Sequence, residues 1–448
     1  LVDAEKWDAV ARRFDAPPQD SALRQAWRPV LFNQFHDIIC SSHIDAVFHN
    51  SLNRFRYAQS RADEALQASL EAIAAQIDTR GDGIPLIVFN PLGWERSDVV
   101  ECSVAFSESG VFELSVIDAA GRPTPCDLLL AERYADGSLK RARLLFIARQ
   151  LPALGYEVYR ILPDQAPPVA SDLTVSHPYG PALRQDLDHG WMENSFYRLE
   201  FDLWSGVITH LFDKAHGWQA ISESLPFANT VVKERDYGNF WQYNGPCKGD
   251  ALNPTPARYP LPALDDPRAD FAHLTHGDGL IRPGKAMAEF SISHPFGAGQ
   301  YATRVRLYAG LPRIDIQTSL VNGEERVRYR AAFPTSLQGG TITYEIPFGA
   351  IQRPEGEYPA QTWVDYSAEG RGVTLLNRGL PGNNVVDGVM LLSLLKCTAL
   401  KEGYGEFQLE TATRRGYEIG VPHTFEYALL VHNGDWRAAQ AYRRGAEF

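Results

Sequence analysis

Hydrophobic residues recur every three or four positions through residues 1–79, which is the spacing of one face of an α-helix. Two such patterns lie within residues 2–14 and 21–34. A third and clearer pattern has an apolar stripe opposite Arg, Glu and Gln. The stripe consists of Ile44, Val47, Phe48, Phe55, Ala62, Leu66, Leu70, Ile73 and Ile77. Helices joined by short loops must bury their stripes together, so residues 1–79 are predicted to form a three-helix bundle.

From residue 80 onwards the dominant period is two, which is typical of β-strands with one buried face. Examples of this alternation are "FELSVID", "FYRLEFD" and "RIDIQTSL", and turn pairs such as Asn322-Gly323 separate the segments. The proline-rich stretch "PDQAPPVA" at 163–170 indicates a connector. We therefore predict an α+β multidomain chain, in which the helices precede a small antiparallel β-sandwich at 80–168 and a large one at 169–448.

Composition narrows the class of partner. The chain of 448 residues has a formal net charge of -12, which argues against nucleic acid or an anionic membrane as its main partner. Its five cysteines, at 40, 102, 126, 247 and 397, are odd in number and scattered, which favours a reducing, cytoplasmic compartment over a secreted disulfide framework. The sequence starts with "LVDAEKWDAV", inside a helical pattern and without methionine, so we expect a further segment upstream.

The stretch "FNQFHDIICSS" places His36 beside Asp37. A single histidine is most often a polar residue at a helix end, because a zinc site needs three or four converging ligands. Two His-x-Asp triplets also occur, at 43–45 and 276–278. The first lies at a helix start, where residues i and i+2 diverge, and the second lies in a turn-like segment. The residues alone therefore do not complete a metal site.

A second candidate is the aromatic and acidic run "ERDYGNFWQYNGPCKGD" at 234–250. Tyr237 and Trp241 have rings that suit the apolar face of a sugar, while neighbouring amides and carboxylates suit its hydroxyls. The alternative is a loop whose rings fill a sheet edge. Trp363 and Asp365 are likewise open to two interpretations, a ligand contact or a place in the core. The sequence shows neither a nucleophilic triad nor a phosphate-binding glycine loop.

The segment "LFNQFHDIICSSHIDAVF" resembles the Asn-Gln-Phe-His-Asp-Ile motif of glycoside hydrolase family 38, the retaining α-mannosidases. The resemblance continues, in the order of the family, through "IVFNPLGWERSDVV", "MENSFYRLEFDLWSGVITHLFDK", "EYPAQTWVDYSAEGRGVTLLNRG" and "HTFEYALLVHNGDWRAA". It thus extends over the length of the chain. It implies a galactose-mutarotase-like supersandwich for the large β-domain.

The resemblance also implies a divalent metal, Zn²⁺, bound between two parts of a longer protein. An upstream barrel would supply a His-x-Asp pair and the catalytic carboxylates, so this chain alone is expected to be inactive. His36 would complete the metal coordination, and Asp37, with Tyr237 and Trp241, would bind the substrate, an α-mannoside or mannose-containing oligosaccharide. Phe35 in place of a second histidine places the chain nearer the bacterial and cytosolic branch. The family's usual glycine is Ser41 here, so Cys40 or His43 could also approach the metal.

Three other functions stay open at this point. The first is a non-catalytic carbohydrate-binding β-sandwich that presents the aromatic residues near 237–243. The second is a purely structural role, in which the β-domains assemble into a homo-oligomer. The third is a self-contained hydrolase that uses His276 and Asp278. Binding to mannosides without the barrel would favour the first, solution mass the second, and turnover by residues 1–448 alone the third.

Overall fold

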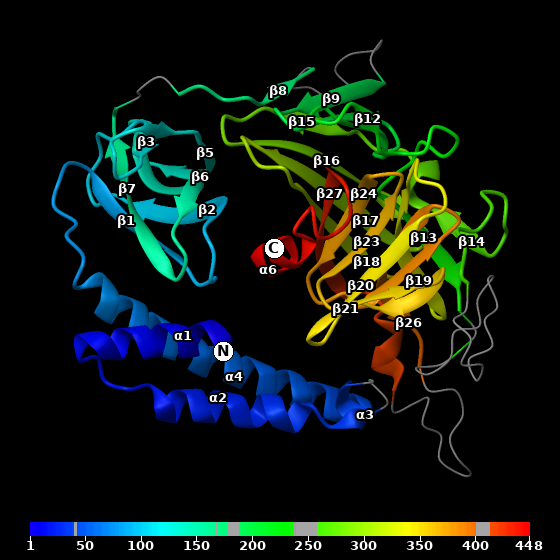
Figure 1. Ribbon diagram of the computed structural model, residues 1–448, viewed down its shortest axis with the longest axis horizontal. Helices are drawn as coiled ribbons and strands as arrows, with labels where there is room; N and C mark the ends of the chain where they lie inside the picture. The colour runs from blue at the N-terminus through cyan, green and yellow to red at the C-terminus, as the bar shows by residue number, and fades with distance from the viewer. Residues whose placement is uncertain (40–42, 166–168, 177–187, 237, 239–257, 400–412) are drawn as a thin grey trace.

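The computed structural model describes residues 1–39, 43–165, 169–176, 188–236, 238, 258–399 and 413–448. Figure 1 shows helices at the start of the chain, along one side of the molecule, with a small and a large β-rich part next to them. Every strand pair in the described sheets is antiparallel, as the register of each pair shows. The predicted class, helices followed by antiparallel β-domains, is confirmed.

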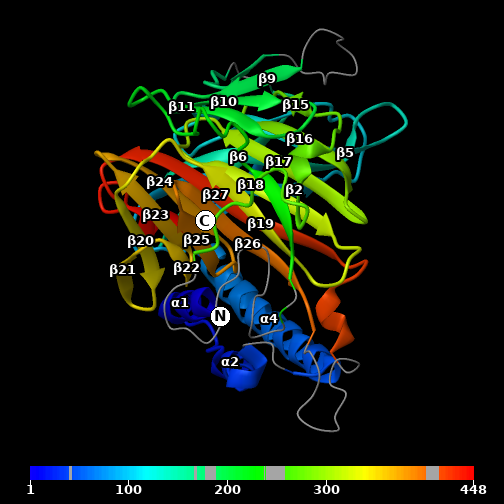
Figure 2. The same ribbon diagram turned by 90° about the vertical axis from the view of Figure 1, so that its right-hand side faces the viewer.

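The helical segment consists of four α-helices and one 3-10 turn among the described residues before residue 80. They are α1 (Val2–Ala11), η1 (Arg12–Phe14), α2 (Asp20–Asn33), α3 (His36–Ile39) and α4 (Asp45–Ala74). Both α1 and α2 pack along α4, and Figure 2 shows the long α4 running beneath the β-rich parts. One small core joins the three through Ala4, Leu23 and Ala65.

The face that α4 buries overlaps the predicted stripe only in part, through Ala62 and Ile73. Its buried residues include Ala58, Ala62, Ala65 and Ile73, whereas Phe55 is 43% exposed. Alanines at this contact let the helix axes approach, and a large ring does not fit between them. The apolar pattern therefore located the helix correctly but placed Phe55 in the core wrongly.

The small β-rich part contains two sheets. The strands are β1 (Ile84–Asn90), β2 (Arg96–Ala105), β3 (Leu114–Ile117), β4 (Pro123–Thr124), β5 (Cys126–Arg133), β6 (Leu139–Leu151) and β7 (Gly155–Pro163). They pair in the orders β1-β7-β3-β4 and β2-β6-β5. Their shared core includes Val116, Phe146, Tyr159 and Ile161.

The carboxylate of Asp127 on β5 ties the small part to the large one. It accepts hydrogen bonds from the backbone N–H groups of Lys285, Ala286 and Met287 at 2.7–2.8 Å. Three charge-assisted hydrogen bonds on one side chain hold β5 against residues 285–287 of the large part.

The large β-rich part is built on a six-stranded and a nine-stranded sheet, with a five-stranded sheet beside them. The six-stranded sheet, in spatial order, is β14 (Ala269–Phe271), β13 (Thr230–Arg235), β19 (Val327–Pro334), β26 (Val389–Cys397), β25 (Gly382–Val386) and β22 (Gly356–Pro359). The nine-stranded sheet is β15 (Leu280–Arg282), β16 (Met287–Phe296), β17 (Gly299–Tyr308), β18 (Ile314–Val321), β27 (Pro422–Asn433), β24 (Arg371–Asn377), β23 (Trp363–Ala368), β20 (Thr341–Ile346) and β21 (Gly349–Arg353). The five-stranded sheet is β12 (Trp218–Gln219), β11 (Ile208–Asp213), β10 (Tyr197–Asp202), β9 (His189–Glu193) and β8 (Thr174–Val175).

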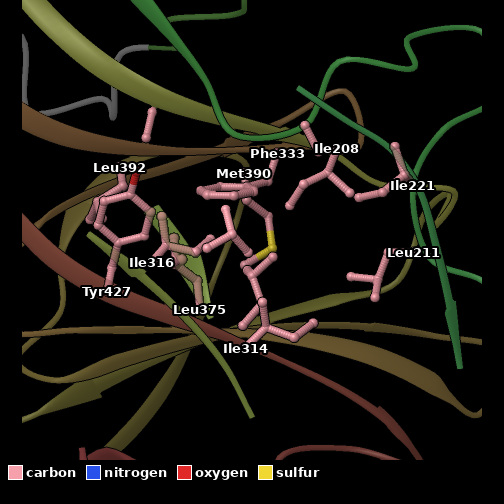
Figure 3. Close-up of a cluster of buried hydrophobic side chains, with 14 of the residues drawn as sticks. Ile208, Leu211, Ile221, Ile314, Ile316, Phe333, Leu375, Met390, Leu392 and Tyr427 are labelled. Carbon is pink, nitrogen blue, oxygen red and sulfur yellow. The ribbon is translucent and has the colours of Figure 1, made fainter. Parts of the chain in front are cut away.

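The main core fills the space between these sheets. Figure 3 shows Phe333 and Met390 of the six-stranded sheet facing Ile314 and Leu375 of the nine-stranded sheet, with Leu211 of the five-stranded sheet near one end. Alternation along each strand sends every second side chain into this core. Short helical elements complete the described chain, η3 (Ala272–Leu274), η4 (Arg414–Tyr417) and α6 (Ala441–Glu447). Within the described residues, no helix is both long and apolar enough to cross a bilayer.

The half-buried imidazole of His273 makes stability depend on pH. Its ring stacks on Phe227 with centroids 4.7 Å apart, its Nδ1 lies 2.8 Å from the Oγ1 of Thr230, and burial lowers its pKa from 6.5 to about 4. Below pH 6.5 His273 is protonated in the unfolded chain, whereas in the folded chain it stays mostly neutral down to about pH 4. The free energy of unfolding is therefore expected to fall as the pH is lowered from 6.5 to 4, and to fall less steeply in His273→Phe.

Urea unfolding at a series of pH values measures this slope. His189, which is exposed on β9, provides the matched control, and His189→Phe should retain the full slope. Burial also lowers the pKa of His294, so part of the slope should remain in His273→Phe. An unchanged slope in His273→Phe would show that His273 is not a source of it.

Candidate functional site

His36 is the first residue of α3, the single turn between α2 and α4. The end of α2 is anchored by the buried Asn33, whose Nδ2 donates to the backbone oxygen of Ser51 on α4 at 2.9 Å. The chain then turns, and the N–H of Ile39 donates to the backbone oxygen of Phe35 at 3.0 Å. The histidine therefore stands on a short turn that begins at an anchored helix end.

The imidazole of His36 is largely exposed to solvent. Its side chain is 79% exposed, that of Asp37 is 53% exposed, and 3.6 Å separates His36 Nε2 from Asp37 Oδ2. The ring of Phe35 lies 4.3 Å from the imidazole, measured between centroids. Phe32, Phe35 and Ile39 are each more than half exposed, an unusual set of apolar side chains around one exposed histidine. We call His36, Asp37 and these three apolar residues the His36 corner.

The start of α4 contacts the large β-rich part. The backbone N–H of Arg415 in η4 donates to Asp45 Oδ2 at 3.0 Å, and the Arg415 guanidinium lies 5.6 Å from the centre of the Phe48 ring. His43 stacks on the same ring at 6.4 Å, and its Nδ1 lies 3.3 Å from the backbone oxygen of Ile44. Within the His43-Ile44-Asp45 triplet, His43 therefore contacts the ring of Phe48, whereas Asp45 binds the backbone of Arg415.

The described residues contain no group of three or more His, Cys, Asp or Glu side chains placed to hold a metal ion. This holds for His36 and also for His276 and Asp278, which are both exposed in the segment after η3. Cys40 lies outside the described residues. The His36 corner therefore offers one imidazole nitrogen and one nearby carboxylate, and within the described chain it does not form a complete metal centre.

The structure describes two of the four remaining candidate residues, and both of these are buried. Tyr237 and Trp241 lie outside the described residues. Trp363 is 1% exposed and belongs to the core beneath α6, so a ligand contact for its ring is excluded by burial. Asp365 is also fully buried, but it sits in a polar cluster. The sequence pattern does not point to the other members of this cluster, because a polar residue at every second position of a strand usually faces solvent. These members are Ser367, Thr374 and His432.

Two stretches of the chain match known domain families. Residues 1–73 match the alpha mannosidase middle domain, and residues 192–402 match the C-terminal domain of glycosyl hydrolases family 38. Alpha-mannosidase 2C1 of Mus musculus is 25% identical over 445 residues, as is its Homo sapiens counterpart. In both comparisons the match covers 96% of this chain but 36% of the relative, so the chain spans about a third of the length of these relatives.

Solved structures show the same fold. A family 38 protein from Enterococcus faecalis superposes with a TM-score of 0.78 at 18% identity, covering 99% of this chain and 56% of that one. An alpha-mannosidase from Enterococcus faecalis V583 gives a TM-score of 0.77 at 17% identity, covering 99% and 54% of the two chains. At these identities the likeness concerns the fold, from the helical start to the last strands.

Proposed function

Because the chain belongs to glycoside hydrolase family 38, we propose that it forms the helical and β-rich part of a metal-dependent α-mannosidase that acts with retention of configuration. The observation that carries the proposal is the open imidazole of His36, on a turn within the segment similar to the middle domain. The substrate we propose is a terminal α-mannoside, alone or in a mannose-containing oligosaccharide.

The side chain of His36 is chemically suited to act as one metal ligand. A neutral imidazole nitrogen is among the commonest ligands of Zn²⁺, which typically needs three or four protein ligands. In the described chain the imidazole is 79% exposed, contacts the ring of Phe35 and lies 3.6 Å from the carboxylate of Asp37. We propose that an upstream barrel domain brings the other ligands and covers the exposed side chains of Phe32, Phe35 and Ile39.

This placement gives different roles to the described chain and to the proposed upstream domain. A bound divalent metal, proposed as Zn²⁺, would act as a Lewis acid toward sugar oxygens. His36 would hold and orient that ion, and the carboxylate of Asp37 would accept hydrogen bonds from mannose hydroxyls. The nucleophile and the acid/base are proposed to be a pair of carboxylates on the upstream domain. Residues 1–448 alone are then inactive.

The cysteines support a cytoplasmic location for this enzyme. Cys102, Cys126 and Cys397 are free thiols in the described chain, and Cys397 is buried. Burial raises the pKa of all three thiols, which keeps them protonated and unreactive. Unpaired thiols of this kind are common where the compartment is reducing.

Removal of metal tests the proposed function. The full-length protein is expected to hydrolyse an aryl α-mannoside, and dialysis against a chelator should lower the rate at least about 100-fold because the Lewis acid is lost. Added Zn²⁺ should restore the rate. Thermal unfolding of the dialysed protein checks that the fold survives. Undiminished turnover after verified metal removal, or turnover by residues 1–448 alone, would contradict the proposal.

A further inference from the structure

The end of α2 is held to α4 by the amide of Asn33, three residues before His36. This side chain is 1% exposed, and its Nδ2 donates to the backbone oxygen of Ser51 at 2.9 Å. Ser51 is itself buried, near the start of α4. Figure 1 shows α3, the turn that carries His36, where α2 ends and α4 begins. The amide therefore fixes the point on α4 at which this turn starts.

The turn is otherwise held by bonds within itself. The N–H of Ile39 donates to the backbone oxygen of Phe35 at 3.0 Å, and the N–H of Phe35 donates to that of Phe32 at 3.2 Å. The side chains of Phe35, His36 and Ile39 are more than half exposed, so packing restrains them little. A second contact with α4, the Arg54 guanidinium 4.3 Å from the centre of the Phe32 ring, is at an exposed ring and is therefore weak. Local bonds set the shape of the turn, whereas its place on α4 depends on Asn33.

The same amide leaves a buried polar atom without a hydrogen bond. The Oδ1 of Asn33 is buried and accepts no hydrogen bond from the described residues. The amide cannot turn over to find a donor, because the backbone oxygen of Ser51 only accepts and the nitrogen must face it. A buried polar atom without a partner lowers stability by the cost of removing that atom from water.

A leucine at position 33, of nearly the same size, would avoid that cost. The backbone oxygen of Ser51 lies inside a helix, where it also accepts the N–H of Phe55 four residues on, so it would keep a partner without Asn33. Stability alone therefore favours an apolar residue here. A buried unsatisfied group in a folded chain calls for an explanation, and the placement of the turn supplies one.

We infer that Asn33 is a positioning residue for His36, whose amide sets where the imidazole lies at a cost to stability. The inference rests on the proposed function, because it assumes that His36 binds a metal in the full-length protein. Ligand distances at a metal centre hold to within about 0.2 Å, so a turn that shifts along α4 would displace the imidazole from its place. Asn33 acts through His36 and needs no contact of its own with the metal or the substrate.

The Zn²⁺ affinity and the stability of the full-length protein together separate this role from a structural one. Asn33→Leu is expected to weaken Zn²⁺ binding about tenfold, as does the loss of a residue that orients a metal ligand. Competition with a chromophoric chelator measures the affinity. Urea unfolding of the metal-free protein, followed by circular dichroism, should show no loss of stability. A residue with only a structural role would lower stability and leave the affinity unchanged.

Asp8→Leu is the matched control, at the other end of α2. The carboxylate of Asp8 is 4% exposed and accepts hydrogen bonds from the backbone N–H of Gln19, directly before α2, at 2.9 Å and from the Nε of Arg12 at 3.0 Å. Loss of these bonds should lower the stability of the helical segment. The Zn²⁺ affinity should nevertheless equal that of the parent, because the end of α2 that carries the turn keeps its tie to α4.

Asn33→Ala adds no bulk and should also weaken Zn²⁺ binding, so it replaces Asn33→Leu if the leucine variant does not fold. Parental Zn²⁺ affinity in a folded Asn33 variant overturns the inference and leaves the proposed function intact. An equal loss of affinity in Asp8→Leu also overturns it, since any loosening of the helical segment would then have the same effect. A parent that binds no Zn²⁺ overturns the proposed function and this inference with it.

Discussion

Replacement of Arg330 by methionine is expected to lower the free energy of unfolding by about 3–5 kcal/mol, because it leaves a charge buried without its partner. The side chains of Arg330 and Glu234 are both 0% exposed and join neighbouring strands β19 and β13. Their contact is bidentate, with Nε to Oε2 at 2.6 Å and Nη2 to Oε1 at 2.7 Å. Arg330 also donates to the backbone oxygens of Tyr259 and Pro260, so the variant loses an anchor for that segment. Urea unfolding followed by circular dichroism measures the change.

Two further variants serve as controls for the effect of Arg330→Met. Arg330→Met with Glu234→Leu should recover much of the loss, because no charge is then stranded in the interior. Arg143→Met removes an exposed cross-strand pair with Glu101, whose side chains are 55% and 36% exposed, and should cost less than about 1 kcal/mol. If Arg330→Met costs no more than Arg143→Met, the buried pair is not the support of the six-stranded sheet that its geometry indicates.

His36→Ala is expected to lower kcat/KM of the full-length protein for an aryl α-mannoside at least about 100-fold, since the proposed metal loses a protein ligand. The imidazole is exposed and makes few contacts in the described chain, so the variant should fold with nearly the parental stability. His276→Ala is the matched control, an exposed histidine from the loop after η3 in the large β-rich part, and should leave kcat/KM unchanged. Equal rates in the two variants would contradict the assignment of His36.

The alternation of apolar and polar residues predicted the order of helices and strands well, because burial of one face imposes a period on the sequence. It failed where size rather than polarity decides the packing. On α4 the buried Ala62 belongs to the predicted stripe, but so does the exposed Phe55, and the stripe leaves out the buried Ala58 and Ala65, since close helix contacts favour small side chains. Hydrophobicity alone ranks phenylalanine above alanine and so includes Phe55 in the buried face while it leaves out Ala58 and Ala65.

The candidate site was predictable in part, and for a different reason. Spacing alone left His36 as a helix-end residue, and only the resemblance of its surrounding motif suggested a metal ligand. The exposure of His36 is compatible with that prediction but does not test it. The Asp365 cluster could not be predicted, because it depends on the register that brings Asp365, Thr374 and His432 together from three strands.

The central claim is that His36 supplies one ligand to a metal bound by the full-length protein. The most direct measurement is the metal content of the purified full-length parent, His36→Ala and His276→Ala, by elemental mass spectrometry. The account predicts about one equivalent of Zn²⁺ in the parent and in His276→Ala, and a large loss in His36→Ala. A His36→Ala protein that retains its full metal content and its rate would show that His36 is a surface histidine at a helix end.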